Sequence, residues 1–350
     1  MNAVIKKDML EMNISDIEKE KLKNSHFFIT GANSSLAQYM VFYLLHLNED
    51  ENYNIKINVL VRNEEKAHDI YKEYIDQINF IVQDICTPIT FDGKIDYIIH
   101  TAGSASPWFI LNDPVGVINA NTVGTLNVLN LAKDKNIKQL LFTSTREIYG
   151  QIPNNVDYIT EDVVGSIDTL DSRSCYPESK RAAETLLKAF YNQYKVPFTI
   201  ARIAHTYGPG MEIKNDGRIM ADLISAAVND EDIKLASDGT TMRGFCYITD
   251  TAAGMFKILL SGTITEAYNL SNETEYKEIK ETAKLILKIK DNENLKLILN
   301  EDGQFKGGYT KGKFTQMSTK KLESLGWYPK VSLEDGIKST IQYYTDKESK

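Results

Sequence analysis

The fold is decided by the stretch His26-Phe27-Phe28-Ile29-Thr30-Gly31-Ala32-Asn33-Ser34-Ser35-Leu36-Ala37. A β-rich run ends at Thr30 and a helical pattern opens at Ser35, so the chain must turn tightly at Gly31. The same pairing of a strand with a helix recurs along the chain. Strands are expected at 26–30, 55–61, 78–82, 97–100, 139–143 and 197–203, and helices at 35–47, 64–75, 115–133 and 178–195. This alternation predicts an α/β fold, a doubly wound parallel sheet covered by helices on both faces.

The turn at Gly31 has the features of a dinucleotide-binding site. Relative to a T-G-x-x-G-x-x-G fingerprint, Ser34 and Ala37 replace two glycines, and both are small enough for a pyrophosphate to approach the helix amides. A plain strand-to-helix turn is the alternative, but the motif opens the first βαβ unit, which favours a cofactor. Arg62 ends the second strand, where it can pair with the 2′-phosphate of NADP or stack on adenine, so NAD and NADP both stay open. Asp84 is placed to receive the adenine amino group or is a solvated loop residue.

The strongest catalytic motif is Tyr176-Pro177-Glu178-Ser179-Lys180, which comes after Ser144-Thr145 at the end of the fifth strand. Pro177 suits a first helical turn, so Lys180 follows Tyr176 by one turn and the two side chains can meet. The Lys180 ammonium and a nicotinamide cation would lower the pKa of Tyr176 from its usual value of about 10. Tyr176 could then take the proton of an alcohol held by Thr145 while hydride leaves for the nicotinamide. A helix-surface pair is the alternative, which the position of the motif disfavours.

Composition excludes several classes of function. The 350 residues carry 40 basic and 48 acidic side chains, a net charge of −8, which argues against nucleic acid or an anionic membrane as the main partner. Any phosphate must therefore be held by a few arginines, backbone amides and a helix N-terminus. Cys86, Cys175 and Cys246 are far apart in sequence, so neither disulfides nor a metal site is expected. The sequence shows neither a signal-peptide pattern nor a bilayer-spanning run, and a cytoplasmic location is expected.

The chain divides into three expected regions. Residues 1–24 form an amphipathic helical extension, placed as a lid or brace, and 25–206 form an NAD(P)-binding Rossmann domain with return elements near 240–262. Residues 207–350 form a smaller, interleaved α+β lobe that binds substrate. Its expected elements are helices near 219–228, after Asp250, at 276–289 and at 333–344, and a strand at 233–236.

Several further segments share one family's pattern, from about Ser25 to Tyr344. They are His100-Thr101-Ala102-Gly103-Ser104-Ala105-Ser106-Pro107, Asn121-Thr122-Val123-Gly124-Thr125-Leu126-Asn127, Ser144-Thr145-Arg146-Glu147-Ile148-Tyr149-Gly150, Cys175-Tyr176-Pro177-Glu178-Ser179-Lys180-Arg181, Asn215-Asp216-Gly217-Arg218 and Leu325-Gly326-Trp327. With these motifs the chain resembles the extended short-chain dehydrogenase/reductases that modify nucleotide sugars. Within that family it is most similar to the UDP-glucuronate decarboxylase and sugar 4,6-dehydratase branch.

The resemblance implies roles for individual residues. Thr145, Tyr176 and Lys180 would oxidise C4 of the sugar, and Glu147 would lie beneath the ring and remove the C5 hydrogen that a C4 ketone acidifies. A capping or buried paired carboxylate is the alternative for Glu147. The implied cofactor contacts are Gly31, Asn33, Ser34, Leu36, Arg62, Asp84, Ile85, Ala102 and Lys180. The implied substrate contacts are Ser104, Arg146, His205, Arg218 and Arg243, of which Arg218 and Arg243 would grip the nucleotide diphosphate unless they form surface ion pairs. A homodimer through helices 115–133 and 178–195 is also implied.

The chain departs from the branch around the sugar. Arg146 stands where dehydratases carry an aspartic acid, and a guanidinium cannot act as an acid, so dehydration would need another proton donor. Lys311, Lys313 and Phe314 occupy the region where decarboxylases place an arginine for the sugar carboxylate, although a lysine or Arg146 could take over. His205 replaces a substrate-facing asparagine and is either a core histidine or a changed sugar contact.

These residues support a nucleotide-sugar enzyme of the epimerase, dehydratase or decarboxylase type, with tightly bound NAD(P) and a nucleotide-diphosphate sugar as substrate. One alternative is an NADPH-dependent 4-keto-sugar reductase, favoured if Arg62 marks NADPH. Another is a non-catalytic Rossmann nucleotide sensor. Such sensors commonly lose the Tyr and Lys pair that this chain keeps.

Overall fold

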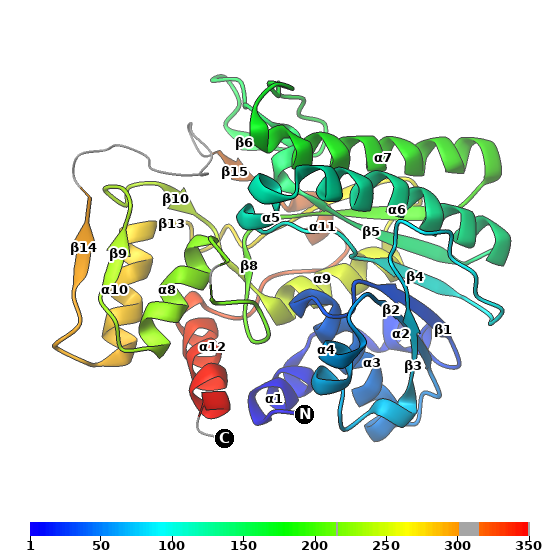
Figure 1. Ribbon diagram of the computed structural model, residues 1–350, viewed down its shortest axis with the longest axis horizontal. Helices are drawn as coiled ribbons and strands as arrows, with labels where there is room; N and C mark the ends of the chain where they lie inside the picture. The colour runs from blue at the N-terminus through cyan, green and yellow to red at the C-terminus, as the bar shows by residue number, and fades with distance from the viewer. Residues whose placement is uncertain (215, 301–314, 349–350) are drawn as a thin grey trace.

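The computed structural model describes residues 1–214, 216–300 and 315–348. Its centre is a sheet of seven strands in the order β12-β7-β5-β4-β1-β2-β3 (Figure 1). Every neighbouring pair in this sheet is parallel. The strands are β1 His26–Thr30, β2 Lys56–Val61, β3 Ile78–Val82, β4 Tyr97–His100, β5 Gln139–Thr145, β7 Phe198–Ile203 and β12 Ala267–Leu270. The predicted α/β fold with a doubly wound parallel sheet is confirmed.

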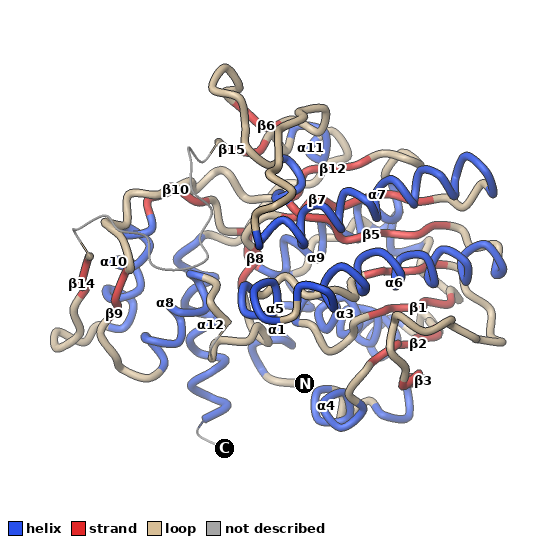
Figure 2. Tube along the Cα trace, turned by 45° about the horizontal axis from the view of Figure 1, so that its top comes forward, coloured by secondary structure: helices blue, strands red, loops and turns tan. Residues whose placement is uncertain are grey.

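Helices cover both faces of this sheet (Figure 2). Phe27 and Ile29 of β1 belong to a core with α3 (Ser35–Glu51) and α9 (Ile248–Ser261). Phe28 points the other way, into a core with α6 (Pro114–Lys135) and α7 (Cys175–Tyr194). Because the sheet is buried on both faces, its strands are apolar at successive positions in the sequence.

The chain reverses its direction of winding at β1, which lies between β2 and β4. Thr30 pairs with Leu60 on one side and with His100 on the other. Ligands of doubly wound sheets bind beyond the carboxyl ends of the strands at this switch point. The Gly31 turn and the end of β5 both open onto that edge.

A second group of elements lies to the left in Figure 1. It contains α8 (Ile219–Val228), α10 (Ile279–Lys290) and α12 (Leu333–Glu348), with β9 (Ile233–Leu235) paired to β14 (Leu297–Leu299) and β10 (Met242–Arg243) paired to β13 (Lys277–Glu278). The chain returns to the main sheet with α9 and β12 before α10. The remaining elements are α4 (Glu64–Ile70), η1 (Ile75–Gln77), α5 (Pro107–Asn112), η2 (Arg146–Tyr149), β6 (Tyr158–Ile159), η3 (Ser172–Ser174), β8 (Thr206–Tyr207), β11 (Cys246–Tyr247), β15 (Gln316–Met317) and α11 (Lys320–Glu323). The predicted domain boundaries stay predictions.

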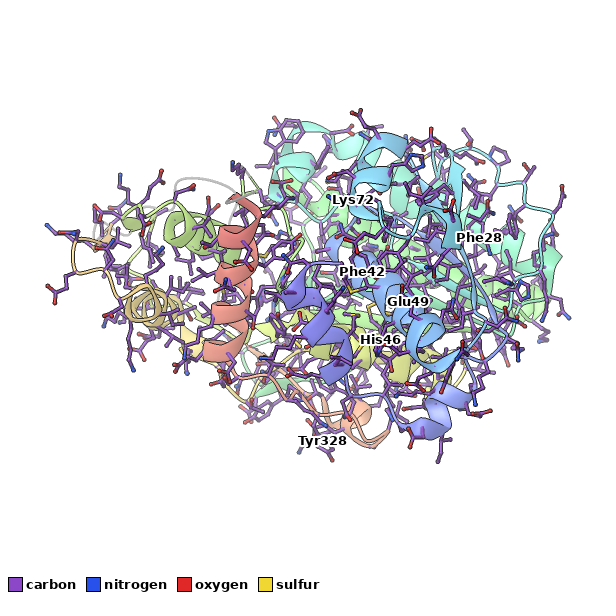
Figure 3. All side chains as sticks on the ribbon, turned by 90° about the horizontal axis from the view of Figure 1, so that it is seen from below. Phe28, Phe42, His46, Glu49, Lys72 and Tyr328 are labelled. Atoms are coloured by element: carbon purple, nitrogen blue, oxygen red, sulfur yellow. The ribbon has the colours of Figure 1, made fainter. Side chains whose placement is uncertain are left out.

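The N-terminal extension differs from the single helix expected over 1–24. It forms α1 (Ala3–Glu11) and α2 (Asp16–Glu20), because Ser15 and Glu18 build a capping box that starts a second helix. Seen from below, α1 lies between α12 and α3, the helix from which Phe42 and His46 project (Figure 3). The hydroxyls of Tyr39 and Tyr247 donate to one oxygen of the buried Asp8, at 2.5 and 2.9 Å. This extension therefore joins the first helix of the sheet to β11.

Over the described ranges, none of the helices is both long and apolar enough to cross a membrane.

Candidate active site

The turn after β1 requires a glycine at residue 31. Gly31 has a φ of +70°, and a Cβ there would lie 2.9 Å from the backbone N and Cα of Ala102. The backbone N–H of Ser34 donates to the Gly31 oxygen at 2.9 Å and closes the turn. The Ala102 N–H donates to the Thr30 hydroxyl at 3.2 Å, which holds the β4 loop against this turn.

The start of α3 is suited to an anion. Within the described structure, the N-cap Ser34 forms no side-chain capping bond, so the first helix amides stay available. Asn33 donates to the Asn63 oxygen at 2.8 Å, while its own Oδ1 is buried and has no hydrogen-bond partner among the described residues. Leu36, in the first turn of the helix, is partly buried against the core. The open amides and this lone acceptor fit the dinucleotide that the sequence predicts.

The predicted adenine-side residues meet at one end of β2 and β3. Arg62 is exposed and lies within electrostatic range of Cys86, whose N–H donates to Asp84 Oδ1 at 2.8 Å. The Ile85 side chain packs against Gly124, and the Ile85 carbonyl accepts a bond from Asn127 at 2.9 Å. The Asp84 carboxylate thus stabilises its own loop, and its contact with adenine stays a prediction.

The structure brings together the predicted catalytic hydroxyls. Thr145 ends β5, Tyr176 lies in the first turn of α7, and the Thr145 side chain lies close enough to Tyr176 to affect its pKa. Burial raises the pKa of Tyr176, opposed by Thr145 and by the charge of Arg218. A lowered pKa for this phenol is therefore a prediction for the enzyme with its cofactor bound.

Lys180 is buried one turn after Tyr176. Its Nζ donates to the Thr143 carbonyl at 2.8 Å and lies 4.6 Å from the centre of the Phe142 ring. Nζ would be 3.6 Å from a Cβ on Gly103, so it faces the loop after β4. Burial lowers the pKa of Lys180 to about 8, opposed by Glu184. The ammonium is thus fixed on the edge where the cofactor is expected.

Two buried residues support this edge and were missed as site residues by the sequence analysis. Asn121 donates to Ser179 at 2.9 Å, and its Oδ1 lies 2.6 Å from the place of a Cβ on Gly103. His100 contacts the hydroxyls of Thr30 at 2.8 Å and Thr125 at 3.1 Å, and burial lowers its pKa to about 3. Both residues lie in the quoted family segments, which were a signal for them. The neutral His100 links β1, β4 and α6.

Glu147 lies in η2, two residues beyond Thr145, whose hydroxyl accepts a bond from the Glu147 N–H at 3.2 Å. The carboxylate forms an ion pair with Arg173, whose Nη2 is 3.5 Å from each oxygen. The predicted alternative of a paired carboxylate therefore applies to its contacts, while its catalytic role stays a prediction. Arg173 belongs to no motif that the sequence analysis used, although it stands three residues before Tyr176.

The predicted sugar contacts Arg146, His205 and Arg243 lie close enough to affect one another's charge. Burial lowers the pKa of Arg243 to about 10, with Arg146 acting in the same direction. The pKa of His205 is lowered by desolvation and by the charges of both arginines. Arg146 donates to the Thr315 carbonyl at 3.0 Å and lies within range of Glu273, a carboxylate that the sequence analysis did not identify. This cluster adjoins Glu147, which also acts on Arg146.

The other predicted substrate residues lie outside the cluster of Arg146, His205 and Arg243. Arg218 pairs with Asp216, with Nη2 at 3.0 Å from Oδ2, and its charge acts on Tyr176. The alternative of an ion pair therefore applies to Arg218, while its contact with a nucleotide diphosphate stays a prediction. Ser104 lies in the loop between β4 and α5. The region of Lys311, Lys313 and Phe314 lies outside the described residues.

This fold and this site define a class: dinucleotide-dependent enzymes of the extended short-chain dehydrogenase/reductase type. The model of the NAD dependent epimerase/dehydratase family matches residues 27–271. The chain belongs to that family, and the predicted resemblance is confirmed. It is an NAD(P)-dependent enzyme of the nucleotide-sugar epimerase, dehydratase or decarboxylase type.

Relatives and solved structures agree with this assignment. UDP-glucuronic acid decarboxylase 6 of Arabidopsis thaliana is 35% identical over 325 residues, covering 90% of each chain. UDP-glucuronic acid decarboxylase 3 of the same plant is 33% identical over 321 residues, 90% of this chain and 87% of its own. An epimerase of Methanothermobacter thermautotrophicus has the same fold, with a TM-score of 0.82, 19% identity and coverage of 95% of this chain and 96% of its own.

Proposed function

We propose that the protein decarboxylates a UDP-linked hexuronate through transient oxidation at C4 of the sugar. The observation that carries this proposal is the position of Glu147, which with Thr145 lies close enough to Tyr176 to affect its pKa, while a partly buried Arg146 stands in place of the acid that dehydration needs. The UDP-glucuronic acid decarboxylases among the relatives support the same reaction. Cationic groups at the sugar also suit an acidic substituent better than a neutral one.

The chain's residues have separable tasks in this reaction. Thr145 holds the C4 hydroxyl and Tyr176 takes its proton. The Gly31 turn and Lys180 would hold NAD, which would supply a hydride acceptor and later the donor, so that there is no net redox change. Once C4 is a ketone, the bond from C5 to the carboxylate breaks, its electron pair moves to the C4 oxygen, and carbon dioxide leaves. C5 then gains a proton taken up from water, which Glu147 would relay to it.

We further propose NAD rather than NADP as the resident cofactor. The family description supports NAD. Arg62 is exposed, so its guanidinium is available to stack on adenine without a 2′-phosphate. Acid extraction of the purified protein followed by chromatography of the released nucleotide tests this choice. Recovery of NADP would contradict it.

The second candidate is an NADPH-dependent 4-keto-sugar reductase, favoured by Arg62 at the end of β2. One assay separates the two. Purified protein is incubated with UDP-glucuronic acid and with UDP-, TDP-, GDP- and CDP-hexoses, with and without added NAD or NADPH, and products are followed by mass. A product lighter by carbon dioxide without net cofactor consumption supports the proposal. Loss of water, an unchanged mass with a new isomer, or stoichiometric cofactor consumption would each overturn it.

We also propose that the protein is a homodimer. Val115, Ile118, Val123 and Leu126 are large apolar side chains exposed along α6. In Figure 2, α6 runs beside α7 on the outer side of the sheet. An apolar helix face of this kind is typical of a surface that another chain covers.

A further inference from the structure

Arg173 is a largely buried cation whose position is fixed by its own loop. It lies in η3 directly before α7, and its backbone N–H donates to Asp171 Oδ1 at 2.8 Å. The hydroxyl of the next residue, Ser174, donates to the Asp168 carbonyl at 2.5 Å. Because these bonds hold the backbone, the guanidinium is free to serve groups outside the loop.

The contact between Arg173 and Glu147 leaves bonding capacity on the arginine. Nη2 is 3.5 Å from both Glu147 oxygens, longer than a charge-assisted hydrogen bond of about 2.8 Å. The other amino nitrogen, Nη1, is buried and has no hydrogen-bond partner in the described part of the chain. A buried donor without an acceptor is unfavourable, so an acceptor on a ligand would be bound there with a gain.

The neighbours of this guanidinium place it beside the sugar ring. Arg173 acts electrostatically on Tyr176, the proposed base for the C4 hydroxyl, and contacts Glu147, the proposed proton carrier at C5. A group that adjoins both side chains lies next to the C4–C5 side of the ring. The substituent on C5 is therefore the part of the substrate nearest to Arg173.

We propose that Nη1 of Arg173 binds the acidic group on C5 of the sugar while Nη2 keeps Glu147 oriented. The inference rests on the proposed function and makes Arg173 the residue that selects a hexuronate over a neutral hexose. Because the carboxylate departs as uncharged carbon dioxide, this contact favours the bound substrate and not the later species. Its loss should therefore raise KM more than it lowers kcat.

Equilibrium binding tests this role without turnover. In a Tyr176→Phe background, calorimetry measures the affinities of UDP-glucuronic acid, UDP-glucose and UDP for the Arg173→Gln and Arg173→Lys variants. Lys188→Gln is the matched control, because it removes one exposed positive charge from α7, the helix that follows Arg173. We expect Arg173→Gln to lower the affinity for UDP-glucuronic acid about tenfold, because a hydrogen bond to a charged group is lost. The affinities for UDP-glucose and UDP should stay within about twofold of those without the substitution. Arg173→Lys should recover part of this loss.

A second background separates recognition from support of Glu147. If Arg173 binds the substrate, Arg173→Gln lowers the affinity for UDP-glucuronic acid by the same factor whether residue 147 is glutamate or is changed by Glu147→Gln. An equal loss for all three ligands, or an effect that disappears with Glu147→Gln, would overturn the proposal. The mass assay on the wild type is independent: a protein that binds UDP-glucuronic acid through Arg173 yet releases no carbon dioxide would refute the proposed reaction only.

Discussion

At the scale of single residues, Tyr176 in α7 lies beside Thr145 at the end of β5, and Thr145 acts to lower its pKa. Replacing Tyr176 by Phe removes the proton acceptor and keeps the ring that packs against Ile110 and Val117. We expect kcat to fall about a thousandfold, with the affinity for UDP unchanged. Product formation under single-turnover conditions and UDP calorimetry check both parts. Undiminished turnover in this variant would show that Tyr176 is not the base, whereas a wild type that binds UDP but converts no sugar would favour the nucleotide-sensor interpretation.

Glu147 allows the steps of the reaction to be separated. In Glu147→Gln the amide cannot carry a proton at C5, while Thr145 and Tyr176 remain able to act at C4. We expect turnover with UDP-glucuronic acid to fall about a hundredfold and the absorbance of reduced nicotinamide to build up after mixing. Stopped-flow absorbance measures this signal. Slow turnover with no rise in absorbance would place Glu147 in the oxidation step instead.

The predictability of the site follows from where its residues stand in the sequence. Thr145, Tyr176 and Lys180 could be found because a strand end and one helical turn fix their spacing. Arg173 and Glu147 lie 26 residues apart and meet only through the tertiary fold. Glu273 reaches Arg146 from the loop after β12, a relation that no local pattern encodes.

At the scale of elements, burial on both faces explains why most of the sheet was predictable. Strands such as Tyr97–His100 are continuously apolar or aromatic and buried at every position. By contrast, β12 is an edge strand that pairs with β7, and the polar Asn269 interrupts its apolar run, so it gave little signal. The helix expected over 64–75 ends at Ile70, since Tyr71 turns away from helical geometry and its hydroxyl donates to the Ala32 carbonyl.

The brace formed by α1 should make stability depend on pH. Burial raises the pKa of Asp8 from 3.8 to about 6 despite bonds from Tyr39 and Tyr247. A raised folded pKa stabilises the protein while the group is protonated, below about pH 4, and that contribution is lost as the pH rises through 6. Asp8→Asn keeps an oxygen acceptor and cannot ionise. The difference in free energy of unfolding, Asp8→Asn minus wild type, should therefore increase by about 2 kcal/mol from pH 4 to pH 7.5.

Urea unfolding at the two pH values measures this difference. Asp92→Asn changes an exposed carboxylate in a loop and serves as the control. A gap between Asp8→Asn and the wild type that is the same at both pH values would show that Asp8 does not titrate on folding.

At the scale of the whole molecule, the catalytic edge and the proposed subunit contact share a helix. The α7 helix carries Tyr176 and Lys180 in its first turns and packs along α6, whose outer face exposes Val115 and Ile118. If a second copy covers that face, it also buttresses the catalytic helix. Dimerisation would then hold the site together without lending it a residue.

Two charges on this face test the arrangement. We expect the wild type to elute as a dimer and Val115→Glu combined with Ile118→Glu as a monomer, because two carboxylates cannot be buried there without partners. Ile264→Glu puts a charge on an exposed isoleucine elsewhere and should leave the dimer intact. Size-exclusion chromatography with light scattering gives the masses, and circular dichroism checks the fold. A monomeric wild type, or a double variant that stays dimeric, would move the subunit contact away from α6.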